Sequence, residues 1–85
     1  MATIETYFGQ QIKQLREARE ISQEEFAYQA DLSAQYVSRI ERGVHSPSLM
    51  VIEKIAKALD MPISELILHV EKSMLGHTRR ARRRS

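Results

Sequence analysis

The feature that most constrains the fold of this chain is a tight turn between two short helical patterns. Ser22 opens the stretch "SQEE", in which the Ser22 hydroxyl can accept a hydrogen bond from the Glu25 amide while the Glu25 side chain reaches back. A helix is therefore expected to begin at Gln23. Only three residues separate the end of this helix from the next helical pattern: Asp31, Leu32 and Ser33.

The second helix of the pair is expected over residues 34–42. Ser33 has a side chain suited to the N-cap position. Gly43 is the residue type best able to adopt the left-handed conformation that follows a helix end. The preceding helix is expected to turn a narrow apolar face inward, made of Phe26, Ala27 and Ala30.

Three further helices are expected from apolar residues that recur at steps of three and four. One covers about residues 4–19, with an inner face of Phe8, Ile12, Leu15 and Arg19. Another begins at Pro47, and its core face holds Leu49, Ile52, Ile55, Ala56 and Leu59. The last can reach Leu75 before Gly76, and its apolar stripe is Ile63, Leu66, Ile67, Val70 and Met74. With no strand pattern, the expectation is a compact all-α fold of five helices in one domain, residues 1–76.

Composition excludes several classes of protein. The 85 residues contain no cysteine, which rules out disulfides, thiolate metal sites and cysteine nucleophiles. No signal-peptide pattern or apolar run of membrane length is present, so a cytoplasmic protein with no membrane partner is expected. The three histidines share no metal spacing, and no catalytic constellation or phosphate loop is evident. We therefore expect neither an enzyme nor a bound cofactor.

The charge of the chain is unevenly distributed. Residues 1–76 hold eight Lys and Arg against eleven Asp and Glu, a net charge of −3, and five arginines in residues 77–85 bring the chain to +2. Such a basic end suits a polyanionic partner. It is equally typical of a solvated terminus that keeps a protein soluble. Both interpretations stay open, and the segment is expected to be disordered.

Helix 34–42 has an inward carboxylate. When residues are placed about 100° apart with Val37 as reference, Glu41 lies about 40° to one side and points partly into the fold. An unpaired buried charge costs several kcal/mol, so Glu41 requires a cation or several donors. The helix over residues 4–19 offers two cations near its apolar stripe, Arg16 and Arg19.

The opposite face of the same helix is polar and carries Gln35, Ser38, Arg39 and Arg42. Most polar helix faces are simply solvated. This face has no carboxylate, however, although the rest of the body is acidic. Gln and Arg can form paired hydrogen bonds with purine edges in the major groove of DNA, and Ser is tolerated at several bases. A solvated face and a DNA-reading face are the two interpretations.

A second apolar stripe is expected on the last helix, about 130° around from the first. It follows a spacing of seven residues and consists of Met61, Leu68 and Leu75. One helix packed on a small core cannot bury both stripes, so the second is expected to form a dimer interface. The alternative is that these are isolated exposed apolar residues, which are common on protein surfaces.

Residues 9–67 resemble the helix-turn-helix domain of phage repressors and Cro proteins, often called the Xre family. The resemblance rests on four stretches in register: "SQEEFA", "YVSRIERG", the Pro and Leu of "SPSL", and "IAKALDMPISEL". It implies a lambda-repressor-like fold of five helices, in which helices two and three form the helix-turn-helix. Asp31 departs from the family pattern, which commonly has Gly in the turn, although Asp adopts the left-handed conformation better than most residues.

The resemblance also implies roles for individual residues. Contacts with DNA bases are assigned to Ala34, Gln35, Tyr36, Ser38 and Arg39. Contacts with the DNA backbone are assigned to Gln23, Ser33, Arg42, Val44, His45 and Ser46. A buried ion pair is assigned to Arg16 and Glu41, which selects Arg16 over Arg19.

This resemblance predicts a sequence-specific transcription regulator that binds a near-palindromic operator in double-stranded DNA as a homodimer. The compact size and "YVSRIERG" are similar to restriction-modification controller proteins, which govern their own operon, and a phage-type repressor is a near alternative. An antitoxin with a toxin partner and a regulator that contacts RNA polymerase are further alternatives. A protein-interaction module, in which the polar face is merely solvated, is the alternative from another class.

Overall fold

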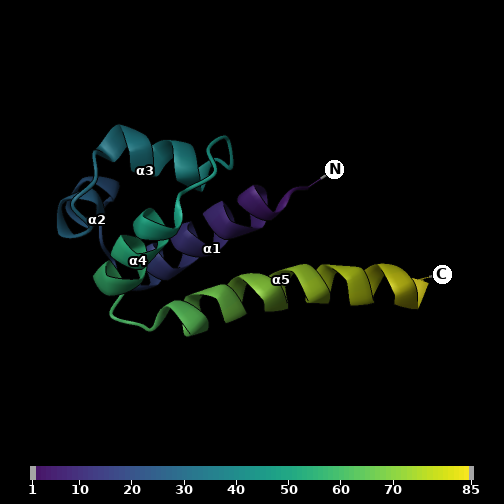
Figure 1. Cartoon of the computed structure of the whole chain (residues 1–85). Coiled ribbons are helices and arrows are strands. Elements are labelled where there is room, and N and C mark those ends of the chain that lie inside the picture. Colours follow the sequence, from purple (N-terminus) through teal and green to yellow (C-terminus); the bar gives the residue numbers. More distant parts are fainter. Residues whose placement is uncertain (1, 85) are drawn as a thin grey trace.

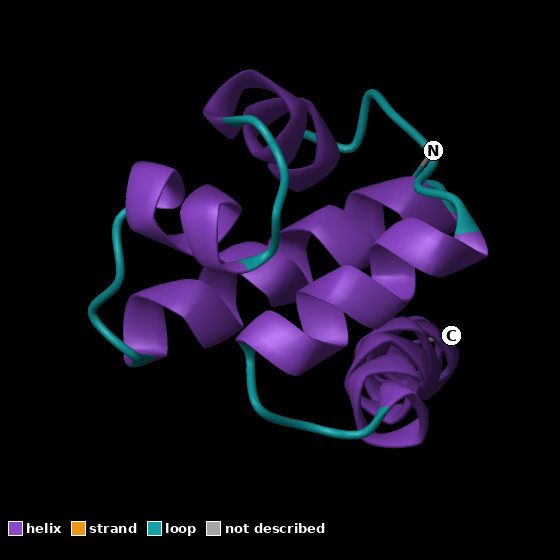
Figure 2. Cartoon of the chain, turned by 60° about the vertical axis from the view of Figure 1, so that its left-hand side comes forward, coloured by secondary structure: helices purple, strands orange, loops and turns teal. Residues whose placement is uncertain are grey.

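The computed structural model describes residues 2–84, with side chains through residue 76, and folds into five α-helices (Figure 1). They are α1 (Ile4–Ala18), α2 (Gln23–Gln29), α3 (Ala34–Glu41), α4 (Leu49–Ala58) and α5 (Ile63–Arg84). Helix α1 packs against both α3 and α5, while α2 packs on α3 and α4 packs on α5. Figure 2, which looks almost along α5, shows only helices and loops in the described chain. The predicted all-α, five-helix fold is confirmed.

Hydroxyl caps begin the first four helices. In each case a side-chain oxygen accepts a hydrogen bond from the backbone amide three residues further on, and the capping residues are Thr3, Ser22, Ser33 and Ser48. Caps of this kind satisfy donors that have no partner within the helix. The predicted starts at Gln23 and Ala34 are therefore confirmed. Of the predicted capping box, the bond from the Glu25 amide to the Ser22 hydroxyl is present, and the Glu25 carboxylate accepts from Gln29.

Left-handed residues end the first four helices and turn the chain sharply. Asp31 has φ 57° and Gly43 has φ 75°, as their residue types predict, and Glu20 and Asp60 adopt the same conformation. After Asp31, the Leu32 amide donates to the Ala27 carbonyl at 2.8 Å. This bond satisfies a carbonyl at the end of α2 and keeps the turn before α3 tight.

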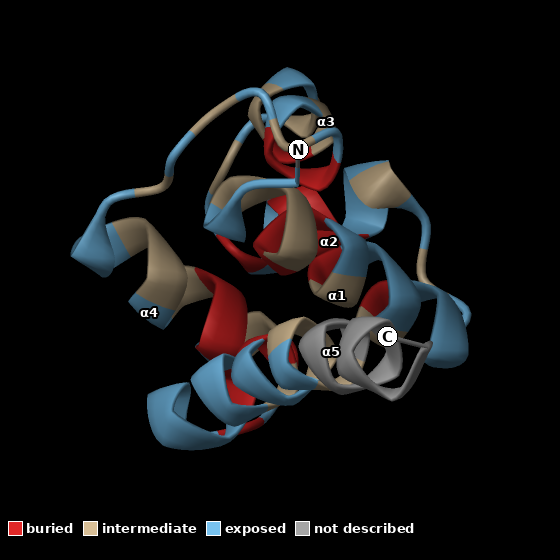
Figure 3. Cartoon of the chain, turned by 90° about the vertical axis from the view of Figure 1, so that its right-hand side faces the viewer, coloured by how far each residue is buried: buried red, intermediate tan, exposed pale blue. Residues whose placement is uncertain are grey.

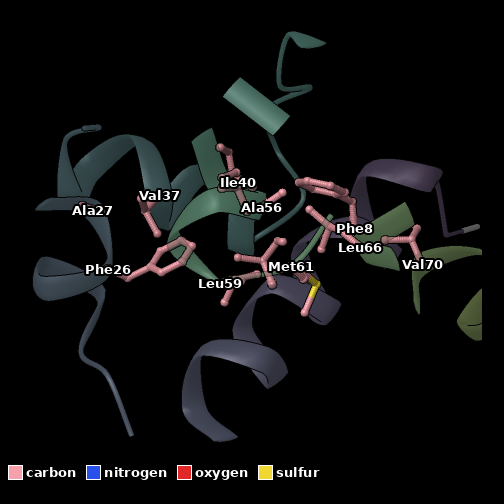
Figure 4. Close-up of a cluster of buried hydrophobic side chains, with 12 residues drawn as sticks. Phe8, Phe26, Ala27, Val37, Ile40, Ala56, Leu59, Met61, Leu66 and Val70 are labelled. Atoms are coloured by element: carbon pink, nitrogen blue, oxygen red, sulfur yellow. The ribbon is translucent and has the colours of Figure 1, made fainter. Parts of the chain in front are cut away.

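A single apolar core lies between the helices, and its side chains point toward one another (Figure 4). The largest fully buried side chains are Phe26, Ile12, Ile40, Ile55, Leu59, Leu66 and Val37. Burying an aliphatic or aromatic side chain of this size contributes about 1.5–3 kcal/mol. Gly9 allows α1 to lie directly against the end of α3, since a Cβ at this position would sit 2.8 Å from the Glu41 carbonyl oxygen.

Helix α4 begins later than the sequence predicts. Pro47 precedes the N-cap residue Ser48, so it does not open the helix. Leu49 is predicted in the core but is 76% exposed, whereas Ile55 and Ala56 are buried. In the first turn of α4, Val51 and Ile52 pack against the core, so the side of the helix that carries Leu49 faces away from it. Figure 3 shows that the buried part of α4 follows its exposed and half-buried first turn.

Helix α5 also differs from the prediction. Leu66 and Val70 are buried, but Ile63 and Ile67 of the same stripe are 38% and 41% exposed. The helix does not end before Gly76 and continues to Arg84. A glycine inside a helix costs only about 1 kcal/mol relative to alanine, and the Ala and Arg residues that follow favour helix. The side chains of residues 77–85 lie outside the described part of the chain, so the proposed role of the basic tail stays a prediction.

The position of Met61 corrects the predicted dimer stripe. Met61 is 9% exposed and belongs to the core, whereas Leu68 and Leu75 are 45% and 48% exposed. Met61 precedes α5 and follows the left-handed Asp60, and its amide donates to the Ala56 carbonyl. It therefore does not follow the helical periodicity that relates Leu68 to Leu75.

Candidate nucleic-acid interface

Helices α2 and α3 form a helix-turn-helix at one edge of the fold (Figure 1). Val37 and Ile40 fix the inner side of α3 in the core, each at 1% exposure. Because these two residues face inward, the residues about half a helical turn away face solvent. The turn thus holds one face of α3 clear of the rest of the molecule.

The five residues predicted to read bases lie in two environments. Gln35 and Arg39 are exposed and lie one turn apart on α3. The remaining three are half-buried: Ala34, Tyr36 and Ser38. Of these, Ala34 and Tyr36 pack against the core. The outer face of α3 therefore presents two long hydrogen-bonding side chains, and the exposed Arg42 follows at the C-terminal end of the helix.

The loop after α3 is attached to both α3 and α1. The Tyr36 and His45 rings meet edge to face, with centroids 4.7 Å apart and an interplanar angle of 68°. Gly43 lies so close to α1 that an added Cβ would be 2.9 Å from the Thr6 Cα. The pKa of the Glu5 carboxyl on α1 is held below its usual value by hydrogen bonds from the Glu5 backbone amide and from the side chains of Ser46 and Thr3. The bond from Ser46 joins the loop to α1. The predicted backbone-contacting residues therefore lie in an anchored loop, with Val44 and Ser46 exposed and His45 half-buried.

The predicted ion pair between α1 and α3 is present, and its cation is Arg16. Arg16 Nε donates to Glu41 Oε2 at 2.7 Å and Arg16 Nη2 donates to Glu41 Oε1 at 3.1 Å. Both residues are 8% exposed. The hydrogen-bonded Glu41 carboxylate raises the pKa of Arg16 above its usual value. Arg19 instead donates to the carbonyls of Leu15 and Leu59, so it joins α1 to the end of α4.

Gln23 is held by the same carboxylate. Its Nε2 donates to Glu41 Oε1 at 2.9 Å, and its side chain is half-buried at the first position of α2. Arg16 Nη1 also donates to the Ile21 carbonyl at 2.7 Å. Residues of α1, α2 and α3 and of the α1–α2 turn are thus joined in one hydrogen-bonded cluster.

Sequence reasoning did not find two of these contacts, the Gln23–Glu41 bond and the Tyr36–His45 pair. Each joins residues of different elements, and the periodicity of a single helix carries no information about such contacts. The sequence did contain one signal, because a buried carboxylate has more acceptor sites than one guanidinium can fill. That signal indicates a further donor but does not identify it.

An apolar groove lies between α1, α4, α5 and the loop after α3. Ile67 and Leu75 of α5 line this groove of about 370 Å³ together with Phe8 of α1, Ile52 of α4, and Ser46 and Pro47 of the loop. Leu68 is also exposed on α5 but does not line the groove. Large exposed apolar patches on small proteins commonly mark contact sites.

Other kinds of site are not evident in the described residues. Nowhere in residues 2–76 do three or more acidic or histidine side chains gather as metal binding would require. Among the helices of the described chain, none has the length and apolar character needed to cross a membrane.

Comparisons with known proteins agree with this geometry. The helix-turn-helix family model matches residues 12–66. Control protein C.MunI of a Mycoplasma species is 44% identical over 73 residues, which cover 85% of this chain and 99% of that protein. Control protein C.BamHI of Bacillus amyloliquefaciens is 43% identical over 65 residues, covering 75% and 80% of the two chains.

A solved structure supports the same relationship. The restriction-modification controller protein C.AhdI of Aeromonas hydrophila superposes with a TM-score of 0.71 at 42% identity, covering 73% of this chain and 94% of that chain. The names of these relatives are those of control proteins, in agreement with the expectation that the chain is not an enzyme. The chain belongs to the helix-turn-helix family and is a DNA-binding transcriptional regulator.

Proposed function

We propose that this protein is a sequence-specific regulator of the restriction-modification controller class, which binds a near-palindromic operator as a homodimer. The observation that carries the proposal is the outer face of α3, where Gln35 and Arg39 are exposed one turn apart. Amide and guanidinium groups can each form paired hydrogen bonds with a purine edge in the major groove. An α3 placed in the groove would bring Ala34, Tyr36 and Ser38 near the same bases.

Contacts with the sugar-phosphate backbone are proposed on both sides of this face. Arg42 is exposed just beyond α3 and supplies a positive charge, and Ser33 lies at the start of the helix. The loop residues Val44, His45 and Ser46 and the α2 residue Gln23 complete the set. Phosphate contacts position a protein on DNA without reading its sequence, so these residues would set the depth and angle at which α3 enters the groove.

The homodimer is proposed to form through α5. Leu68 and Leu75 are exposed, and a second copy would cover them together with the apolar groove that Leu75 lines. A two-fold axis generates an identical patch on the partner, as a self-complementary interface requires. Two copies of α3 about 34 Å apart would then enter successive major grooves on one side of the duplex, which predicts half-sites related by the same two-fold symmetry.

The proposal is tested by the affinity of the protein for DNA from the region upstream of its own coding sequence. At one fixed salt concentration, a regulator should bind a duplex from that region at least about 10³-fold more tightly than a scrambled duplex of equal length. Footprinting should then show a protected site with two-fold symmetry. A protein-interaction module would instead bind both duplexes equally and weakly.

A further inference from the structure

The Glu41 carboxylate connects the buried ion pair to the surface of the helix-turn-helix. It accepts three hydrogen bonds, two from Arg16 and one from Gln23. The Glu41 side chain is only 3% exposed, so it cannot reach a bound molecule itself. Gln23 is half-buried, whereas Arg16 and Glu41 are buried, so Gln23 is the one of these three side chains that offers surface to a ligand.

The bond to Glu41 leaves part of the Gln23 amide free to bind. Its nitrogen carries two hydrogens, of which Glu41 Oε1 accepts one at 2.9 Å. A carboxylate acceptor makes this bond stronger than one between two neutral groups. A glutamine side chain ordinarily loses conformational entropy when its rotatable bonds are fixed in a contact. Here that freedom is restricted in the free protein, so less remains to be lost on binding.

We propose that Glu41 is a positioning residue for DNA binding, which orients the Gln23 amide so that its second N–H donates to a backbone phosphate. The inference rests on the proposed function, because it places Gln23 at the DNA backbone. It assigns Glu41 a role besides stability, since the carboxylate determines which way the amide points.

Arg16 allows a carboxylate to perform this role close to DNA. A lone anion at this position would repel the phosphates, but the Arg16 guanidinium lies 2.7 Å from Glu41 and neutralises the pair. Arg16 is held in turn by the Ile21 carbonyl at 2.7 Å. Glu41 can therefore orient Gln23 without adding a net negative charge to the interface.

A second Gln–Glu pair on α2 provides a matched control. Gln29 donates to Glu25 at 3.1 Å, but both residues are exposed. The two pairs have the same chemistry, and only the Gln23–Glu41 pair includes a buried carboxylate bound to an arginine. Variants of Gln29 and Glu25 should therefore leave DNA affinity unchanged within about twofold.

A double-mutant cycle with Gln23→Ala and Glu41→Gln separates positioning from stability. Glu41→Gln preserves the side-chain size but replaces one acceptor oxygen with a donor, so the three donors compete for a single oxygen. Affinities are measured at a temperature where circular dichroism shows each variant to be folded. Each single change should weaken binding about tenfold per half-site, as expected for one charge-assisted hydrogen bond.

The double variant should bind about as well as the weaker single variant, because Glu41 has nothing to orient once Gln23 is removed. If the two losses of affinity multiply in the double variant while the wild type still prefers the upstream duplex, the positioning role of Glu41 is overturned and the proposed function is not. Equal wild-type affinity for the upstream and scrambled duplexes would instead overturn the proposed function.

A measurement on the free wild-type protein tests the same inference if Glu41→Gln fails to fold. NMR relaxation should show the Gln23 side-chain amide to be more rigid than that of Gln10, which is exposed on α1. On adding the upstream duplex, the Gln23 amide protons should shift while those of Gln29 do not. A Gln23 amide as mobile as that of Gln10 would overturn the proposal.

Discussion

At the residue scale, the Arg16–Glu41 pair decides how α1 and α3 are joined. Both charges are removed from water, which costs several kcal/mol for each ion and is offset only by close geometry and further hydrogen bonds. The structure provides both, since Arg16 binds Glu41 and the Ile21 carbonyl, and Glu41 also binds Gln23. In the described residues no buried side-chain nitrogen or oxygen lacks a hydrogen-bond partner. The pair is thus a complete unit whose two halves depend on each other.

Removing one half should therefore be costly. We expect Glu41→Ala to lower the free energy of unfolding by about 3 kcal/mol, because it leaves the Arg16 cation buried without a partner. Chemical denaturation measures the change. Glu53→Ala, at an exposed position within α4, is the control and should cost no more than about 0.5 kcal/mol. Similar losses in the two variants would contradict the assignment.

The proposed base contacts are tested one side chain at a time. We expect Gln35→Ala and Arg39→Ala each to weaken binding to the preferred duplex by about 1–3 kcal/mol, with a smaller loss on a random duplex. The difference arises because hydrogen bonds to base edges are made only at the correct sequence, whereas phosphate contacts are made everywhere. Binding measured by fluorescence anisotropy on both duplexes provides the test. Equal losses on both would assign these residues to the DNA backbone.

At the scale of elements, α5 has a buried side and an exposed side. Leu66 and Val70 are buried in the core, Leu68 and Leu75 are exposed, and Val70 and Leu75 both line the apolar groove. The core-facing side belongs to the fold of one chain. The exposed side is not needed to close the core of one chain, which is why a second copy is proposed to cover it.

A charge placed on this exposed side should prevent association. We expect Leu68→Glu to convert the dimer to a monomer at micromolar concentration, because it would put two carboxylates into an apolar two-fold interface. Sedimentation velocity measures the change. Tyr28→Glu makes a comparable substitution at an exposed residue of α2 and should leave the dimer intact. The proposed interface is wrong if Leu68→Glu remains dimeric or if the wild type is monomeric.

At the scale of the whole molecule, α1 lies between α3 and α5 and packs against both (Figure 1). Residues 1–76 carry a net charge of −3, and the exposed Arg39 and Arg42 give the α3 side a local positive charge. Specific binding is thus expected to depend on the charges around α3 and not on the net charge of the chain.

The salt dependence of binding distinguishes the two interpretations of the arginines of residues 79–84. If they bind phosphates, their deletion should flatten the slope of log affinity against log salt concentration by about 0.9 for each phosphate that is no longer neutralised, as Arg42→Ala should also do, and a solvated tail should leave the slope unchanged. Titrations at several salt concentrations give both slopes. A tail that binds phosphates would reveal itself by a flatter slope after deletion.

Features that depend on neighbouring residues could be predicted from the sequence without a structure. Ser22 and Ser33 cap helices through amides three positions away, and Asp31 and Gly43 adopt left-handed conformations, so helix starts and the central turn could be predicted. The inward direction of Glu41 followed from helical geometry in the same way. Its partner did not, since Arg16 and Arg19 both lie near the inner face of α1 and only the family resemblance separated them.

Packing between the helices determines which apolar residues are covered and which polar groups meet. Leu49 has the correct spacing for the core but is exposed, because the first turn of α4 contacts the core through Val51 and Ile52 instead. Met61 is in register with Leu68 and Leu75 by residue number but is buried, because the chain has turned at Asp60 before α5 begins. Gln23 meets Glu41 because α2 packs on α3. Burial and long-range hydrogen bonds depend on distances between elements, and periodicity within one element does not contain them.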